Sequence, residues 1–285
     1  MENNNTEIVV RKARGDDHEH VIEVEASSTP NLRYLPRVFY MFISDQVGEF
    51  SVAEVEGKVV ACGKFTVLPD ESAWLETLRV IPAYQGLGIG KRLYQRFFDI
   101  AHLKGVTTMR MYTGLKNAVS KRLAERFGFQ LAATYRGALL SCQPEAIHTS
   151  SNTFSQVTNP EKATALLMPS REKWTGFFVM NRTFYAITPA LCADLARKGF
   201  VYEDPTSGSV VTIGARFMPE QALHIGIFRG NVTACLTFAM QKGGECGAER
   251  LSCLFPSSAK EIQHSLLQHG FQLEVSDFIV MEVQV

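Results

Sequence analysis

A run of closely spaced glycines, from Gln85 to Arg92, is the stretch of this chain best suited to binding a ligand. Its sequence, Gln-Gly-Leu-Gly-Ile-Gly-Lys-Arg, follows an apolar run over 74–82 and precedes a helical pattern over 89–100. Glycine allows a positive φ and lets the backbone approach a ligand closely. A helix that begins here directs unpaired N–H groups and the positive end of its dipole at the turn. The spacing therefore predicts a strand, a turn and a helix that bind an anion, most naturally a pyrophosphate.

The spacing of these glycines differs from two common phosphate-binding motifs. Gly86, Gly88 and Gly90 lack the third glycine of the dinucleotide fingerprint, and the run lacks the Gly-Lys-Ser/Thr end of a P-loop. The string Gln85-x-x-Gly88-x-Gly90 instead resembles the acetyl-CoA signature of the GNAT superfamily of N-acetyltransferases. The flanks extend the similarity, because 78–84 resembles the fourth strand of that family and 117–129 resembles its closing helix with a Gly-Phe end. The resemblance covers roughly residues 7–140.

This resemblance implies that the loop binds acetyl-CoA as the acyl donor. The backbone N–H groups of the loop would hold the pyrophosphate, and the strand before it would pair with the pantetheine arm. In the family, the backbone N–H at the position of Val80 polarises the thioester carbonyl, and the position of Asn117 contacts pantetheine; Asn117 could equally be a plain helix N-cap. The expected cofactor-binding residues are Leu78, Arg79, Val80, Gln85, Gly86, Leu87, Gly88, Ile89, Gly90, Lys91, Arg92 and Asn117.

Acetyl transfer to an amine also requires a base, because an amine with a pKa near 10 is protonated at neutral pH. Glu76 is the candidate, since it resembles the strand-four glutamate that serves this role in several branches of the family. It precedes Leu78 by two residues, so both side chains are expected on the same side of the strand. The alternative is a structural carboxylate paired with an arginine.

The general acid and the acceptor site are less clearly marked. Many family members have a tyrosine where this chain has Ala124, so Tyr112 is the substitute candidate for protonating the thiolate. In the family, the two helices near the start form a wall of the acceptor site. Tyr34, Phe39 and Tyr40 are therefore expected to touch the acceptor together with Glu76, although Phe39 could simply belong to the core.

The second half of the chain suggests an internal repeat. Ser51–Leu78 aligns with His224–Leu251 without a gap, and Gly-Phe-Gln-Leu occurs at both 128–131 and 270–273. The first pair of segments lies 173 residues apart in the sequence, and the second pair lies 142 residues apart. This difference predicts that the second copy has lost the glycine loop and its helix and binds no CoA. The alternative is chance similarity between two β-rich halves.

The expected fold is mixed α/β (α+β), with a mostly antiparallel GNAT sheet flanked by helices in tandem with a second, GNAT-like domain. The catalytic domain is expected over 1–145, a linker over 146–172, and the degenerate domain over 173–285. Expected elements include a hairpin turning at Glu56-Gly57, an extended segment over 174–187 and a helix over 189–198.

Composition limits the partners and the compartment. Twenty-nine basic residues balance twenty-nine acidic ones, so nothing favours nucleic acid or an anionic membrane. No apolar run approaches the roughly 18 residues of a membrane span, and the six cysteines contain no C-x-x-C pair. We expect a cytoplasmic monomer or homodimer without a metal.

Together these features predict an acetyl-CoA-dependent N-acetyltransferase that acts on a small amine or free amino acid. A looser similarity over 34–45 and 76–82 points to the branch that resembles histidine N-acetyltransferases. Acetylation of a peptide N-terminus or an aminoglycoside, and a non-catalytic acyl-CoA sensor, stay open. The sequence does not identify the acceptor or the preferred acyl length.

Overall fold

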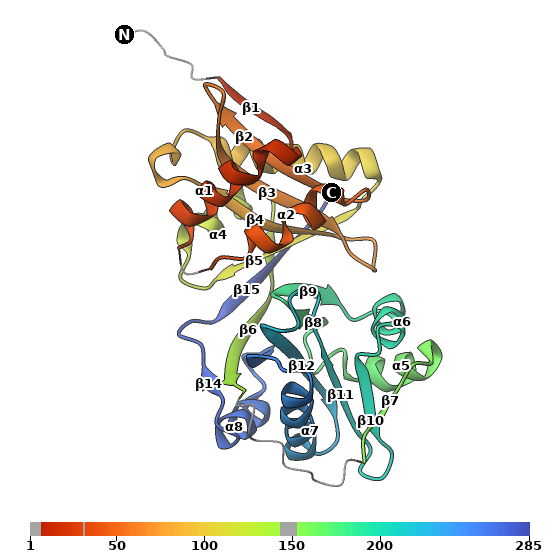
Figure 1. The fold of residues 1–285 in the computed structure, drawn as a ribbon. Helices are drawn as coiled ribbons and strands as arrows, with labels where there is room; N and C mark the ends of the chain where they lie inside the picture. Colours follow the sequence, from red (N-terminus) through yellow and green to blue (C-terminus); the bar gives the residue numbers. More distant parts are fainter. Residues whose placement is uncertain (1–6, 31, 143–152) are drawn as a thin grey trace. The chain divides into compact units, whose positions relative to one another are not determined.

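The computed structural model describes residues 7–30, 32–142 and 153–285, which divide into two compact units (Figure 1). The first unit comprises residues 1–111, 118–130 and 281–285, and the second comprises residues 112–117 and 131–280. The chain therefore passes between the units several times rather than once. The fold is mixed α/β, as expected, with mostly antiparallel sheets flanked by helices.

The first unit is built on five strands in the order β1-β2-β3-β4-β5, antiparallel except for the parallel pair β4–β5. Its strands are β1 (Ile8–Lys12), β2 (Glu49–Val55), β3 (Lys58–Val67), β4 (Ala73–Val80) and β5 (Thr108–Gly114). Its helices are η1 (Gly15–Asp17), α1 (His18–Ser28), α2 (Leu35–Ser44), η2 (Pro82–Tyr84), α3 (Ile89–Lys104) and α4 (Ala118–Arg126). The sharp turn between β2 and β3 forms at Glu56 and Gly57, whose φ angles of 52° and 79° suit a hairpin.

Helices pack on both faces of this sheet. The apolar stripe of α3 (Ile89, Leu93, Phe97 and Ile100) is buried, as the helical spacing predicts, and Phe97 packs beside Phe65 of β3. On the opposite face, α1 packs on β3 and β4. On the α3 face, glycine is required at Gly63, because a Cβ would come within 2.7 Å of the Phe97 ring.

The second unit has the strand order β6-β13-β12-β11-β10-β7, with β14 also paired to β6 and with a separate β8–β9 hairpin. Its strands are β6 (Gln130–Ser141), β7 (Ser155–Gln156), β8 (Phe177–Met180), β9 (Thr183–Ala186), β10 (Val201–Asp204), β11 (Ser209–Gly214), β12 (Ala222–Arg229), β13 (Arg250–Pro256), β14 (Gln272–Leu273) and β15 (Phe278–Gln284), of which β15 ends in the first unit. Its helices are α5 (Pro160–Leu167), η3 (Met168–Ser170), α6 (Pro189–Arg197), α7 (Val232–Glu245) and α8 (Lys260–Gln268).

The strands of the two units pair in the same order and with the same relative directions. In the first, β1 through β4 pair antiparallel and β4–β5 pair parallel. In the second, β7, β10, β11 and β12 pair antiparallel and β12–β13 pair parallel. A helix follows the fourth strand in each case, α3 after β4 and α7 after β12.

The gapless alignment of 51–78 with 224–251 is wrong in its details. Residues 232–245 form α7, whereas their expected counterparts, 59–72, form β3 and the turn that leads to β4. The helix after the fourth strand is thus present in the second unit, and what is shorter is the loop before it, reduced to Gly230 and Asn231. The matching Gly-Phe-Gln-Leu strings do occupy similar positions, since each follows a helix and begins a strand (α4 then β6, α8 then β14).

Domain boundaries also differ from the expected ones. The segment 146–172, expected as a linker, contains β7 and α5, while its first part, 146–152, lies outside the described residues. Residues 281–285 belong to the first unit, where the Val285 N–H donates to the Thr107 carbonyl at 2.9 Å. None of the helices in the described ranges has the length and apolar character needed to cross a membrane.

Candidate acetyl-CoA and acceptor site

The glycine loop joins β4 to α3 through η2 and has the geometry of an anion-binding turn. Gly86 and Gly88 take φ angles of 86° and 87°, which strongly favour glycine. A Cβ at either position would meet no atom within 4 Å, so the loop backbone is open to a ligand. Gln85 fixes the start of the loop, because its Nε2 donates to the Val80 carbonyl at 3.2 Å.

The beginning of α3 provides the donors of this turn. Gly88 is the N-cap and offers no side chain to the helix end. A helical bond runs from Arg92 N to Gly88 O at 3.2 Å, and the N–H groups of residues 89–91 precede it, without acceptors inside the helix. Lys91 and Arg92 are exposed beside them and form no ion pair among the described residues. The positive helix end and these two cations attract an anion such as a pyrophosphate.

The end of β4 next to this loop extends beyond its pairing with β5. β5 pairs with β4 only at Ala73, Trp74 and Leu75. The register that joins β4 to β5 thus ends at Leu75, and the rest of β4, toward the glycine loop, lies beyond it. A strand edge of this kind can accept an extended ligand as an additional strand.

A bulge interrupts β4 at Thr77. Lys64 of β3 pairs with Glu76 and Cys62 pairs with Arg79, so β4 has one residue more than β3 between these pairs. Thr77 takes a φ of 58°, which is rare for a β-branched residue. The expectation that Glu76 and Leu78 share a side is therefore wrong: the extra residue places Glu76 on the same face as Arg79, and Leu78 on the other.

Arg79 is buried and holds α1 and α2 against the sheet. Its guanidinium forms an ion pair with Glu25 of α1, which is fully buried. The same Glu25 oxygen, Oε1, accepts the backbone N–H groups of Tyr34 and Leu35 at 3.0 and 3.1 Å. The Arg79 side chain thus serves the protein interior. Sequence reasoning missed Glu25, because its partner lies 54 residues away.

Glu76 is the carboxylate that β4 presents beside this pair. It is 8 % exposed, and Oε1 accepts a hydrogen bond from the Thr66 hydroxyl at 2.6 Å. Lys64, its cross-strand neighbour, is 1 % exposed and forms an ion pair with Asp45, which follows α2. Glu76 therefore lies on the α1–α2 face in a polar row that sequence reasoning had not anticipated.

The aromatic residues expected at the acceptor wall divide into two groups. Tyr34 is half-buried at the start of α2 and lies over the Arg79 guanidinium, 4.9 Å from ring centroid to Cζ. Tyr40 is exposed and stacks on His18. Phe39 is fully buried between His18 and Phe50, so its position is that of a core residue rather than an acceptor ligand.

Tyr112 and Asn117 belong to the second unit. The Tyr112 ring contacts Phe184 and Phe278, each at 6.0 Å between centroids. Asn117 is exposed immediately before α4, and its N–H donates to the Gly114 carbonyl at 2.9 Å. The position of Ala124 in α4 is buried, consistent with the absence of a tyrosine hydroxyl there.

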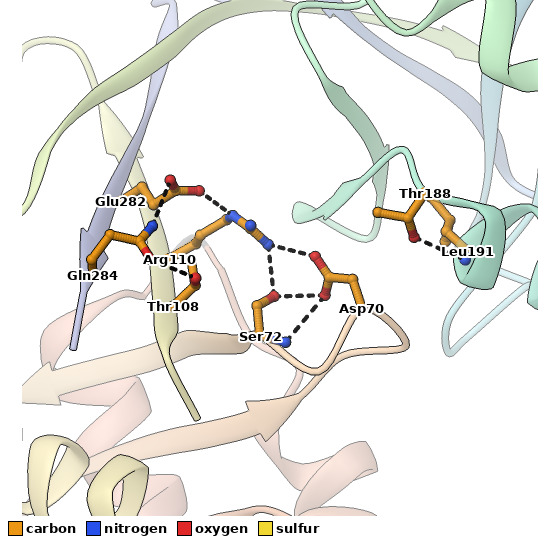
Figure 2. A network of polar contacts seen from close by, with 8 residues as sticks. All are labelled: Asp70, Ser72, Thr108, Arg110, Thr188, Leu191, Glu282 and Gln284. Carbon is orange, nitrogen blue, oxygen red and sulfur yellow. Dashed lines mark hydrogen bonds and ion pairs between the residues drawn. The ribbon is translucent and has the colours of Figure 1, made fainter. Parts of the chain in front are cut away.

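A second buried arginine stabilises the far end of the first sheet (Figure 2). Arg110 of β5 donates to Asp70 at 2.8 Å, to Ser72 at 2.6 Å and to Glu282 at 2.6 Å. Glu282 lies in the last strand, so the end of the chain completes the first unit. In the part of the chain that the structure describes, no group of three or more His, Cys, Asp or Glu side chains could hold a metal ion.

Comparison with known proteins agrees with this geometry. Residues 17–129 match the model of the acetyltransferase (GNAT) family. Over 126 residues, 44 % of this chain and 82 % of its relative, the sequence is 25 % identical to a Bacillus subtilis (strain 168) protein with the provisional name [ribosomal protein bS18]-alanine N-acetyltransferase.

Several solved structures resemble nearly the whole chain. A GCN5-related N-acetyltransferase from Sphaerobacter thermophilus superposes with a TM-score of 0.68 at 13 % identity, covering 97 % of this chain and 95 % of that one. An acetyltransferase-like protein from Pyrococcus horikoshii gives 0.64 at 17 % identity, with 98 % and 89 % coverage. A tandem GNAT protein from the clavulanic acid pathway gives 0.59 at 13 % identity, with 98 % of both chains covered. These likenesses support the fold.

Proposed function

We propose that this enzyme transfers an acetyl group from acetyl-CoA to the amine of a small molecule such as a free amino acid, because residues 17–129 match the model of the acetyltransferase (GNAT) family. The observation that carries the proposal is the loop over 85–92, where open backbone at Gly86 and Gly88 meets the N-terminus of α3. Positioning two substrates in one site supplies much of the rate enhancement in such a reaction.

The loop and the strand edge would divide the binding of acetyl-CoA between them. The N–H groups of residues 86–91, with Lys91 and Arg92, would hold the pyrophosphate. The part of β4 beyond its register with β5, over 78–80, would pair with the pantetheine arm, and a backbone N–H near Val80 would polarise the thioester carbonyl. Asn117, at the start of α4, is the further proposed contact of the pantetheine.

Glu76 would accept the proton that the amine loses, directly or through a water. The amine nitrogen attacks the thioester carbon, the C–N bond forms, the C–S bond breaks, and CoA leaves as a thiolate. The Thr66 hydroxyl would fix the Glu76 carboxylate for this step. Tyr112 is the proposed proton donor to the thiolate, and with Ala124 at the usual tyrosine position, solvent is the other available source.

The second unit is proposed to be a second GNAT-like copy that binds no CoA. The shared strand-pairing order supports a common origin. The start of α7 differs from that of α3 in one decisive respect: the Asn231 side chain caps it, accepting the Ala234 N–H at 3.1 Å. A two-residue loop with a capped helix leaves no open backbone cradle for a pyrophosphate.

The N-terminal amine of a protein is the second candidate acceptor. It is favoured by the 25 % identity to the Bacillus subtilis protein named for alanine acetylation of ribosomal protein bS18. An acceptor peptide that begins with alanine therefore belongs in the same screen as free amino acids.

The test is a screen of the purified chain with acetyl-CoA, following CoA release with a thiol reagent. Acceptors would be the free amino acids, simple amines, an aminoglycoside, and a peptide beginning with alanine together with its N-blocked form. Turnover with free amino acids or amines, and not with peptides, is the expected result. Turnover with only the unblocked peptide would show instead that the acceptor is the N-terminal amine of a protein. Tight acetyl-CoA binding without turnover of any acceptor would favour a sensor.

A further inference from the structure

One face of the second unit's sheet carries His224 and other polar residues that the proposed acetyl transfer does not use. Aromatic contacts identify this face. Phe228 of β12 stacks on Trp174 at 5.3 Å, and a Cβ at Gly226 would meet Phe178 of β8 at 2.9 Å. Since side chains alternate along a strand, His224 faces the same side as these two positions. This is the side that the β8–β9 hairpin covers.

The neighbouring strand extends this polar group. β12 and β13 pair in parallel, with Ala222 opposite Arg250 and His224 opposite Ser252. Directly paired residues point to the same face, so Arg250, Ser252 and His224 lie side by side at the beginnings of the two strands. Ser252 is buried, whereas Arg250 is exposed and gives the group an opening to solvent.

His224 has no internal partner. Its residue exposure is 6 %, and neither Nδ1 nor Nε2 forms a hydrogen bond within the described structure. Leaving a buried polar group unpaired is unfavourable, so such groups in native proteins nearly always have a hydrogen-bond partner. A histidine with both nitrogens free is therefore a position where a bound group is expected.

The charges around His224 favour an anion. Arg182, in the turn of the β8–β9 hairpin, is neutralised by Glu274 at 2.6 Å and lies over the Phe278 ring. Arg250 forms no ion pair with any described residue. Burial, together with the positive charges of Arg182 and Arg250, lowers the pKa of His224 to about 3. The imidazole is thus neutral and can donate one N–H, while Arg250 contributes a positive charge that no carboxylate of the described residues neutralises.

We propose that Arg250, His224 and Ser252 bind the carboxylate of a small monoanionic ligand in the second unit. The Arg250 guanidinium can donate two parallel hydrogen bonds to a carboxylate, and the His224 N–H and the Ser252 hydroxyl can supply the others. The charge of Arg250 matches a monoanion better than a phosphate dianion. This site is separate from the glycine loop, and it gives the second unit a binding role of its own.

The test uses the full chain and measures the melting temperature against increasing sodium acetate, butyrate or glycine, with sodium chloride at equal ionic strength as the reference. Sodium phosphate forms a separate series. The variants are Arg250→Gln and His224→Gln. The matched control is Arg171→Gln, because Arg171 is also an exposed arginine of the second unit but lies in the turn after η3.

The expected result is a saturable stabilisation by at least one carboxylate, with a dissociation constant that Arg250→Gln raises tenfold or more and Arg171→Gln leaves unchanged. His224 ring nitrogen signals should shift with the same saturation curve in the NMR spectrum of histidine-labelled protein. Absence of saturable stabilisation by every carboxylate would overturn the proposal. So would an Arg250→Gln variant that binds like the parent, or stabilisation by phosphate alone.

Discussion

At the residue scale, two carboxylates on one face of the first sheet have different surroundings. Glu25 is fully buried, neutralised by Arg79, and receives two backbone N–H groups. Glu76 receives the Thr66 hydroxyl and lies across from Lys64. The contacts of Glu25 all tie α1 and α2 to β4, which suits a structural carboxylate. Glu76, where β4 extends beyond its register with β5, is the one we propose as the base.

We expect Glu76→Gln to lower turnover roughly 10²-fold or more, because the amide keeps the shape of the side chain but cannot accept a proton. Acetyl-CoA affinity should change little. Steady-state kinetics and calorimetry on the same preparation measure both quantities. Glu7→Gln, an exposed carboxylate outside the site, is the control and should match the parent. Unchanged turnover in Glu76→Gln would assign Glu76 a structural role.

Glu25→Gln should lower the free energy of unfolding of the first unit by about 3–5 kcal/mol, because it leaves the Arg79 guanidinium buried without a counter-charge. Urea unfolding of a Trp174→Phe background measures this, since Trp74 then reports on the first unit. Glu23→Gln in the same helix removes only an exposed ion pair with Lys58, which solvent screens, and should change the free energy of unfolding far less. Equal effects of the two substitutions would contradict the structural role of the buried pair.

His224 should make the second unit sensitive to mild acid. Its pKa is lowered to about 3 in the folded state by burial and by Arg182 and Arg250, so only the unfolded chain takes up a proton near pH 6. The free energy of unfolding is then highest above a pH of about 6.5, the pKa of histidine in the unfolded chain, and falls by about 1.4 kcal/mol per pH unit below it. In a Trp74→Phe background, urea unfolding followed by Trp174 fluorescence between pH 7 and 5 should show this slope. His224→Gln should flatten it; an unchanged slope would exclude His224 as the cause.

Some residue-scale features could not be predicted from the sequence. A threonine in a strand gives no sign of a positive φ, so the bulge at Thr77 and the face of Glu76 were not visible in the spacing. The Glu25–Arg79 pair joins residues distant along the chain, and no local pattern reports it. The glycine loop, in contrast, depends on local backbone freedom, and its position and role as the start of a helix could be predicted.

At the element scale, α3 was predictable and α7 was not. The apolar stripe of α3 follows a clear helical period after the glycines. The region where α7 starts shares a glycine and an Ala-Cys pair with the β2–β3 hairpin. These similar residues nevertheless form a helix in one unit and a hairpin in the other. Gly57 and Gly230 both take a positive φ, which a hairpin turn and a helix entry can each use. Asn231 as an N-cap was the signal that could have separated the two.

Gly88→Glu should abolish measurable acetyl-CoA binding. A glutamate at a φ of 87° is strained, and its carboxylate would repel the pyrophosphate from the N-terminus of α3. Isothermal calorimetry should give one site per parent chain and none for the variant. Gly15→Glu is the control, because it adds the same charge where a Cβ meets nothing and φ is not positive. Two sites per parent chain would show that the second unit also binds the cofactor.

At the scale of the whole molecule, the chain does not divide into two consecutive domains. Residues 281–285 complete the first unit, and residues 112–117 belong to the second. Composition and turn signals suggested a break over 146–172, but that stretch contains α5. A strand added from the distant end of the chain leaves no mark in the local sequence, so these boundaries could not be predicted.

A chain that ends at residue 280 should therefore destabilise the first unit, although every proposed catalytic and cofactor residue is retained. Arg110 would lose Glu282, and the Thr107 carbonyl would lose the Val285 N–H. Arg110 is buried and keeps Asp70 and Ser72 but loses a charged partner. A hydrogen bond between charged groups contributes about 1.5–3 kcal/mol, so we expect a loss of at least about 1.5 kcal/mol in urea unfolding followed by Trp74 in the Trp174→Phe background. A chain that ends at 145 loses the same strand and should aggregate.

Gln284→Ala, which keeps the strand backbone and Glu282, is the control and should unfold close to the parent. If the 280-residue chain unfolds and binds acetyl-CoA like the full chain, the last strand is dispensable and the first unit ends within residues 1–130.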